Sequence, residues 1–202
     1  MRQLILSRHA TSLSNALDAI SCTPPGLGLS EHGRDEARAL GGALDGERID
    51  LAVSSELLRT QETLDAALGD RDVPRLVLAS WNEIHFGRYD GGPLAPYRDW
   101  AWTTPADVVC PGGGESRGAV ALRIAATLDA LVARAEEVVL AVGHALPVRY
   151  VLDAADGLTP TPRITPVGHA VPHRIDVDRV RRAAETLHRW AAAPAFEERA
   201  QA

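Results

Sequence analysis

The sequence contains no lysine, because all 21 of its basic residues are arginine. This absence excludes a lysine Schiff base, a catalytic lysine base and a phosphate-binding loop of the Walker type, which ends in lysine. Cysteine is scarce as well. Cys22 and Cys110 are too few for a disulfide framework and show no paired metal-ligand spacing. We therefore expect a chain that works in a reducing cytosol.

Long apolar runs are also missing, so no segment approaches a membrane span. The first residues show no targeting signal, since charge follows a short apolar run at once. The formal net charge of -6 disfavours binding of nucleic acid through overall charge attraction. We expect a cytoplasmic protein that partners neither nucleic acid nor membrane. The 202 residues, 46% of them hydrophobic, suit a single domain over 1–202.

Short apolar runs alternate with longer amphipathic segments. This alternation predicts an α/β fold, a three-layer sandwich with a mostly parallel central sheet and helices on both faces. One strand is expected at a sheet edge because Pro172 precedes it. The expected strands are Gln3–Ser7, Leu51–Ser54, Arg75–Ala79, Val138–Val142 and His173–Val177. The expected helices are Ser30–Leu44 with Ser30 as its cap, Glu56–Leu68 capped by Ser54 or Ser55, Glu115–Ala135, Ala145–Ala155, and a last helix from a cap at Asp178 to about Ala193.

The segment Trp81–Gly114 interrupts this alternation with aromatic residues, glycines and prolines. We interpret it as a long insertion that roofs one end of the sheet, and loops of this length are usually functional. The tail Pro194–Ala202 is expected to be frayed.

Charged side chains follow the expected strands, and ligands in such folds bind beyond the carboxyl ends of the strands. Arg8 and His9 follow the first strand, and Arg59 lies one turn into the helix after the second. Glu83 follows the third strand and His144 the fourth. We therefore expect these five side chains at one edge of the sheet.

This set suits the transfer of a phosphoryl group. Arginine forks match phosphate oxygens and keep their charge, so Arg8 and Arg59 would clamp a dianionic phosphoryl group. A neutral imidazole can attack phosphorus in line and form a phosphohistidine, while a second, protonated imidazole stabilises the spreading charge. Glu83 can protonate the leaving alcohol and then activate water. These arguments alone do not decide which histidine is the nucleophile.

A series of motifs accompanies these residues over roughly Leu4 to Leu152. Each motif is weak alone, but six in order are specific. They are Arg8-His9-Ala10 with Ser12 and Asn15, Leu29-Ser30 with Gly33 and Ala37, Ser54–Thr63 around Arg59, Glu83 with Phe86-Gly87 and Asp90-Gly91, Pro111–Ser116, and Val142–Ala145. Together they resemble the motifs of the histidine phosphatase superfamily, the phosphoglycerate-mutase-like proteins.

The resemblance implies a metal-independent phosphomonoesterase without a cofactor. It implies a phosphohistidine intermediate on His9, a small phosphorylated metabolite as substrate and inorganic phosphate as product. The site residues that it implies are the catalytic His9, Glu83, His144, Arg8 and Arg59, with Asn15, Ser12 and Ala145 binding the substrate.

Three other functions stay open at this point. A phosphoglycerate mutase would use the same phosphohistidine, but mutases of this family tend to be longer than 202 residues. A non-catalytic binder of phosphorylated ligands would be expected to have lost one of the five charged residues. A metallohydrolase could use the seven histidines. His169 and His173 are not expected to form a metal site, since Pro172 lies between them in a strand.

Some residues also have plainer interpretations. Ser12 and Asn15 can instead cap a helix after the first strand. The aromatic residues Tyr97, Trp100 and Trp102 can pack within the insertion, or they can favour a substrate with an apolar or ring-bearing part beside its phosphate. A homodimer is left open.

The motifs depart from the family pattern at three positions. Ala10 and Ala145 follow the two histidines where glycine is usual, which strains the loop if a left-handed backbone is needed and otherwise narrows the pocket. Gly143 stands where a small hydroxyl residue is common, so one hydrogen bond is expected to be missing. After about Leu158 no motif can be assigned.

Overall fold

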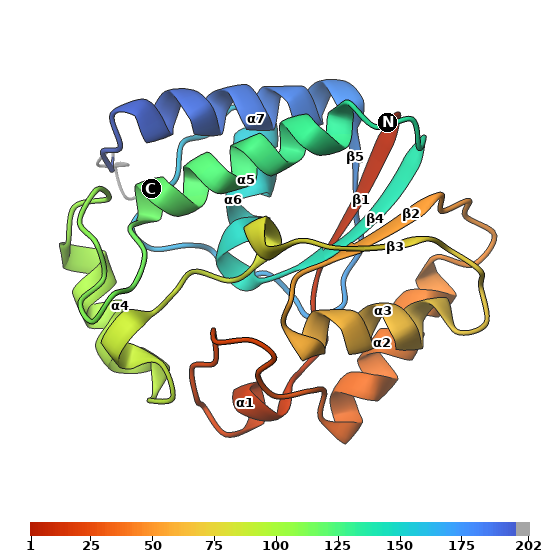
Figure 1. The fold of residues 1–202 in the computed structure, drawn as a ribbon, viewed down its shortest axis with the longest axis horizontal. Helices are drawn as coiled ribbons and strands as arrows, with labels where there is room; N and C mark the ends of the chain where they lie inside the picture. The colour runs from red at the N-terminus through yellow and green to blue at the C-terminus, as the bar shows by residue number, and fades with distance from the viewer. Residues whose placement is uncertain (197–202) are drawn as a thin grey trace.

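The structure, a computed structural model, describes residues 1–196. Its centre is a five-stranded sheet in the order β3-β2-β4-β1-β5 (Figure 1). Four strands are parallel, and β5 lies at the edge of the sheet, as predicted. It runs antiparallel to β1, which the sequence did not indicate. The strands are β1 (Gln3–Arg8), β2 (Leu51–Ser54), β3 (Arg75–Val77), β4 (Val138–Gly143) and β5 (His173–Asp176). This arrangement confirms the predicted α/β fold.

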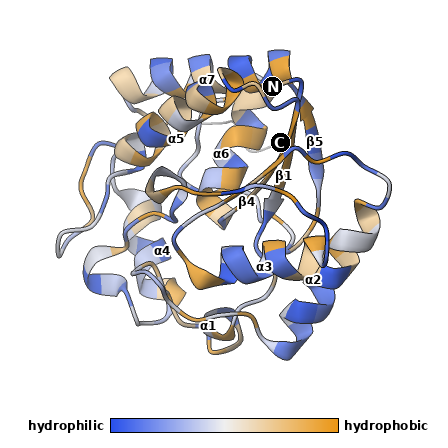
Figure 2. Ribbon diagram, turned by 45° about the vertical axis from the view of Figure 1, so that its right-hand side comes forward, coloured by the Kyte–Doolittle hydropathy of each residue, from blue (hydrophilic) through white to orange (hydrophobic). Residues whose placement is uncertain are grey.

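Helices cover both faces of the sheet (Figure 1). On one face lie α5 (Arg117–Val132), α6 (Ala145–Ala155) and α7 (Val177–Ala192), and on the other lie α2 (Glu31–Ala43) and α3 (Leu58–Leu68). Successive strand residues point to opposite faces. Leu4 and Leu6 therefore pack in the core with α5, α6 and α7, whereas Ile5 packs in the core with α2 and α3. All six residues of β4 are buried, and Figure 2 shows its hydrophobic character between mixed helices.

Side-chain caps start some of the helices, and two of the predicted caps are wrong. Ser30 caps α2 as expected. The last helix begins earlier than predicted, because Asp176 and not Asp178 accepts the hydrogen bond from the backbone of Arg179. The helix α3 begins at Leu58 without a side-chain cap, so the predicted serine cap is wrong.

The insertion contains a helix that the sequence did not predict, α4 (Leu94–Thr103), after two 3₁₀ turns at Ala79–Trp81 and Gly87–Tyr89. Its N-cap is Pro93, which supplies no side-chain hydrogen bond, so the usual start signal is missing. The buried Tyr97 holds α4 in place, with its ring edge-on to Phe86 at 4.5 Å between centroids. A further short helix, α1 (Leu13–Ala16), follows β1.

The predicted frayed tail spans Pro194–Ala202, and its part from residue 197 onward lies outside the described residues. Within residues 1–196, no helix is long and apolar enough to cross a membrane.

Candidate active site

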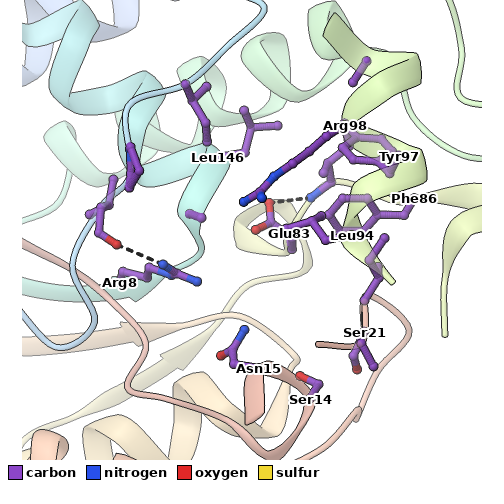
Figure 3. A pocket seen from close by; sticks show the side chains of 18 of the residues that line it. Arg8, Ser14, Asn15, Ser21, Glu83, Phe86, Leu94, Tyr97, Arg98 and Leu146 are labelled. Atoms are coloured by element: carbon purple, nitrogen blue, oxygen red, sulfur yellow. Dashed lines mark hydrogen bonds between the residues drawn. The ribbon is translucent and has the colours of Figure 1, made fainter. Parts of the chain in front are cut away.

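A cavity of about 440 Å³ lies beyond the carboxyl ends of β1 and β4 (Figure 3). Its walls come from the loop after β1, the starts of α3, α5 and α6, the insertion with α4, and the loop that follows α6. Six of the eight predicted site residues line it, namely Arg8, His9, Asn15, Arg59, Glu83 and Ala145. His144 and Ser12 are not among the lining residues.

The hydrogen bonds of His9 define its protonation. Its Nδ1 lies 2.7 Å from the carbonyl oxygen of Ala10, which can only accept, so Nδ1 carries the proton. Its Nε2 accepts a hydrogen bond of 3.1 Å from Nε of Arg59. Burial and the positive charges of Arg59 and Arg8 hold the pKa of His9 well below its usual range. The free protein therefore holds a neutral imidazole with the lone pair of Nε2 on the side of Arg59.

His144 lies behind Arg59 and is fully buried. Its Nδ1 accepts from Nη2 of Arg59 at 3.2 Å, and its Nε2 donates to the hydroxyl of Ser55 at 2.8 Å. Its ring centroid lies 5.3 Å from that of His9. Burial and the charge of Arg59 hold the pKa of His144 well below its usual range. Arg59 thus joins the two imidazoles, both neutral in the absence of an anion.

Arg8 and Arg59 each have a hydrogen-bond donor without a partner among residues 1–196. Nη1 of Arg8 donates to the carbonyl of Val167 at 2.9 Å. Within residues 1–196, however, the buried Nε of Arg8 and the buried Nη1 of Arg59 have no partner. Neither guanidinium forms an ion pair within 4.0 Å in this part of the chain. Buried donors without partners are costly, so this end of the cavity suits an anion with several acceptor oxygens.

Glu83 lines the same cavity, and its Oε1 accepts a hydrogen bond of 2.9 Å from the backbone of Ile84 (Figure 3). Burial raises the pKa of Glu83, although Arg59 and Arg8 act against this rise. A carboxyl group with a raised pKa can donate a proton at a pH where an ordinary glutamate cannot.

Ser12 serves mainly as the cap of α1. Its hydroxyl accepts from the backbone of Asn15 at 3.3 Å, and the side chain of Asn15 accepts from the backbone of Ser12 at 3.1 Å, which completes a capping box. The sequence left this capping interpretation open. Ser14, whose hydroxyl lies 2.8 Å from that of Ser12, lines the cavity in its place.

The departures from the family pattern leave the backbone unstrained. Among the described residues, the only positions other than glycine with a positive φ are Asp18 and Ala170, so neither Ala10 nor Ala145 needs glycine's freedom. Gly143 makes room for an indole, because a Cβ there would lie 2.9 Å from Nε1 of Trp81. A hydroxyl residue would displace that ring.

The loop after α6 contributes contacts that no motif indicated. Nδ1 of His169 lies 2.8 Å from the carbonyl oxygen of His9, and the two rings meet edge-on with 5.4 Å between centroids. Of the three aromatic residues considered for the substrate, Tyr97 and Trp102 line the cavity and Trp100 does not. Arg98 and Arg117 line the cavity too, although no motif indicated them.

Comparison with known proteins connects this geometry to a family. The sequence profile of the histidine phosphatase superfamily (branch 1) matches residues 4–192. The adenosylcobalamin/alpha-ribazole phosphatase of Escherichia coli (strain K12) is 28% identical over 131 residues, which cover 60% of this chain and 63% of that protein. The match thus spans less than two thirds of that relative.

Two further relatives match over more of their length. The 2,3-bisphosphoglycerate-dependent phosphoglycerate mutase of Brucella ovis is 33% identical over 176 residues, covering 79% of this chain and 84% of that protein. The structure of a mycobacterial glucosyl-3-phosphoglycerate phosphatase with VO3 superimposes with a TM-score of 0.73 at 27% identity, covering 86% of this chain and 92% of the other.

Proposed function

The chain belongs to the histidine phosphatase superfamily, branch 1, and from that premise we propose that it hydrolyses a small phosphomonoester through a phosphohistidine on His9. This membership confirms the resemblance drawn from the motifs. The proposed hydrolysis rests on the geometry of the site. The single observation that carries it is a pair of buried arginine donors, without partners among residues 1–196, beside an unprotonated Nε2 of His9.

In the first step, the phosphoryl oxygens take the free donors of Arg8 and Arg59. The hydrogen bond of the Arg59 Nε–H passes from Nε2 of His9 to a phosphoryl oxygen, which frees the lone pair of Nε2. This lone pair attacks phosphorus as the bond from phosphorus to the ester oxygen breaks. The proton of the Glu83 carboxyl passes to the departing oxygen, so an alcohol leaves and not an alkoxide. The proton on Nδ1 of His9 stays bonded to the carbonyl of Ala10 and stabilises the charged phosphohistidine.

In the second step, the Glu83 carboxylate takes a proton from water, and the resulting hydroxide equivalent attacks phosphorus. The bond from phosphorus to nitrogen breaks, inorganic phosphate leaves, and His9 and the protonated Glu83 are restored. When phosphate oxygens draw the donors of Arg59 away, Nδ1 of His144 loses its partner and can take up a proton. His144 then shares the charge that spreads over the phosphoryl oxygens.

The size of the cavity favours hydrolysis over mutase chemistry. A mutase must keep water from its phosphohistidine, whereas a volume of about 440 Å³ leaves room for water beside a small ester. Phosphoglycerate mutase activity is the second candidate, because the Brucella relative has the higher identity over the longer alignment. Single-turnover kinetics separate the two, since a phosphorylated mutase loses its phosphoryl group to water only slowly.

The test is hydrolysis of p-nitrophenyl phosphate in excess EDTA by the native protein, by His9→Ala and by the matched control His188→Ala. His188 lies on α7 and pairs with Asp129 away from the cavity. We expect turnover in the native and control proteins and none in His9→Ala. Turnover that EDTA abolishes but His9→Ala retains would refute the proposal. Absence of turnover in all three, with phosphoglycerates isomerised, would support the mutase instead.

A further inference from the structure

Glu83 lies on a stretch of chain without regular secondary structure, between the 3₁₀ turns Ala79–Trp81 and Gly87–Tyr89. Its carboxyl accepts a hydrogen bond from the backbone of its own neighbour Ile84, which does not attach it to the rest of the fold. The place of the carboxyl in the cavity therefore depends on how the backbone of residues 80–85 is held. A proton donor has to stay within about 0.5 Å of its productive position.

Arg123, in the second turn of α5, holds this stretch from one side. Its Nη1 donates to the carbonyl oxygens of Ser80 and Asn82 at 3.0 and 2.8 Å. Its Nη2 donates to the carbonyl oxygen of Glu83 itself at 3.2 Å. After β3 the chain turns against α5, where these bonds form (Figure 1). A single guanidinium thus binds three carbonyl groups within residues 80–83.

Glu115 fixes the orientation of this guanidinium. Its two carboxylate oxygens accept from Nε and Nη2 of Arg123 at 2.7 and 3.0 Å, and the side chains of Arg123 and Glu115 are only 20% and 23% exposed. All five N–H groups of the guanidinium therefore have acceptors. Glu115 also holds the chain beyond Glu83. Its Oε2 accepts from the backbone of His85 at 3.2 Å, and its own backbone N–H donates to the carbonyl of His85 at 2.8 Å.

Arg123 and Glu115 act on Glu83 only through the backbone. Neither residue is among those that line the cavity, so neither can touch a substrate there. Their bonds to Glu83 and to His85 lie on either side of Ile84. The pair thus fixes the backbone from which the carboxyl of Glu83 enters the cavity.

We propose that Arg123, oriented by Glu115, is a positioning residue that holds Glu83 where its carboxyl can protonate the departing oxygen of the ester. This inference rests on the proposed function, which assigns that proton transfer to Glu83. Loosening these bonds leaves the phosphate donors of Arg8 and Arg59 in place. It weakens only the help that the departing oxygen receives, so the loss should grow with the basicity of that oxygen.

The test compares two aryl esters of similar shape whose leaving oxygens differ in basicity. p-Nitrophenolate departs without a proton, whereas phenolate, as basic as a tyrosine side chain, needs one. The measured quantity is kcat/KM, which reports the steps up to departure of the phenol and leaves out the later attack of water.

Arg123→Lys keeps the positive charge but lacks the planar set of donors, so it changes the geometry of the contact. For this variant, kcat/KM for phenyl phosphate should fall by roughly 10- to 100-fold, the cost of a displaced catalytic group. The value for p-nitrophenyl phosphate should fall no more than a few-fold. Equal falls for both esters would show a merely structural role, and an unchanged value for phenyl phosphate would show no role. Either result overturns the inference.

The matched control is Arg174→Lys. Arg174 lies on β5, where its Nε donates to Glu47 at 3.0 Å and its Nη2 to the carbonyl of Ala43 at 3.0 Å, away from the cavity lining. This variant loses the same kind of contacts and should keep kcat/KM for both esters. If Arg123→Lys does not fold, Glu115→Gln keeps the shape of the orienting side chain, removes its charge, and should show the same selective loss.

A combined variant tests whether Arg123 acts through Glu83. Arg123→Lys combined with Glu83→Gln should cleave phenyl phosphate no more slowly than Glu83→Gln alone, because the group that Arg123 positions is already gone. Losses that multiply would overturn the inference.

Glu83→Gln also separates this inference from the proposed function. A selective loss for phenyl phosphate in Glu83→Gln, without one in Arg123→Lys, would refute the positioning role alone. No selective loss in Glu83→Gln would refute the acid role that the proposed function assigns to Glu83 and, with it, the positioning role.

Discussion

Thr63 links the loop that carries His9 to the helix that carries Arg59. Its Oγ1 accepts a hydrogen bond of 3.0 Å from the backbone of Ala10 and donates one of 2.6 Å to the carbonyl of Arg59. The side chain is fully buried. Thr63→Val keeps the shape of the side chain and removes both bonds, so the N–H next to His9 loses its acceptor.

The expected cost follows from that orphaned donor. An unsatisfied buried N–H costs about 1–3 kcal/mol. For a chain of this size each kcal/mol lowers Tm by about 2–4 °C, which gives a fall of about 2–12 °C. The carbonyl of Ala10 also accepts the hydrogen bond from Nδ1 of His9. A shift of the Ala10 backbone therefore moves the imidazole of His9. A displacement of ~1 Å at the reacting atoms lowers kcat by roughly 10²-fold.

The assay pairs thermal unfolding with hydrolysis of p-nitrophenyl phosphate, and the matched control is Thr127→Val. Thr127 is also buried, and its hydroxyl contacts Ser80 and the carbonyl of Arg123 away from the cavity lining. Both variants should lose stability, but only Thr63→Val should lose kcat. Equal kcat losses in the two variants, or an unchanged kcat in Thr63→Val, would show that Thr63 does not position the site.

Three other perturbations test separate features. Glu83→Gln should remove the fall of kcat/KM at rising pH, because the variant has no carboxyl proton to lose. Burial raises the pKa of Glu83, so its ionised form destabilises the fold. The variant should therefore have a higher Tm than the native protein at pH 8, and the difference should shrink as pH falls and native Glu83 is protonated. Gly33→Ala should lower Tm strongly, because its Cβ would lie 1.9 Å from the carbonyl oxygen of Thr11. Gly42→Ala should not, because its Cβ would meet no atom within 4 Å, and similar Tm values for the two variants would contradict the packing. Vanadate binding should take up a proton, measured by calorimetry in buffers of different ionisation enthalpy, as the pKa of His144 rises beside the anion; binding without proton uptake would argue against its role.

The fold could be predicted because its signals are local. Buried strands with β-branched composition, and a serine cap such as Ser30, lie within a few residues of what they specify. The gathering of Arg8, His9, Arg59 and Glu83 at one cavity followed from the rule that parallel strands end at the same edge. Their chemical roles remain predictions.

What the sequence did not reveal depends on partners far along the chain. The helix α4 has no capping side chain and is held by Tyr97 against Phe86. The sequence predicted Asp178 as the cap of α7, but Asp176, which pairs with Gln3 at the end of β5, is the cap in the structure. Nothing near His169 in the sequence indicates that it binds the carbonyl of His9.

The bonds from Arg8 to Val167 and from His169 to His9 also set an order of events during synthesis. The partners are separated by 159 and 160 residues along the chain. A ribosome that has just released Arg8 and His9 must therefore add most of the polypeptide before either residue acquires its full set of contacts. A nascent chain arrested before that point should carry the proposed nucleophile without the contacts that hold it, so phosphohistidine formation on stalled chains should begin only once Val167 and His169 have left the exit tunnel.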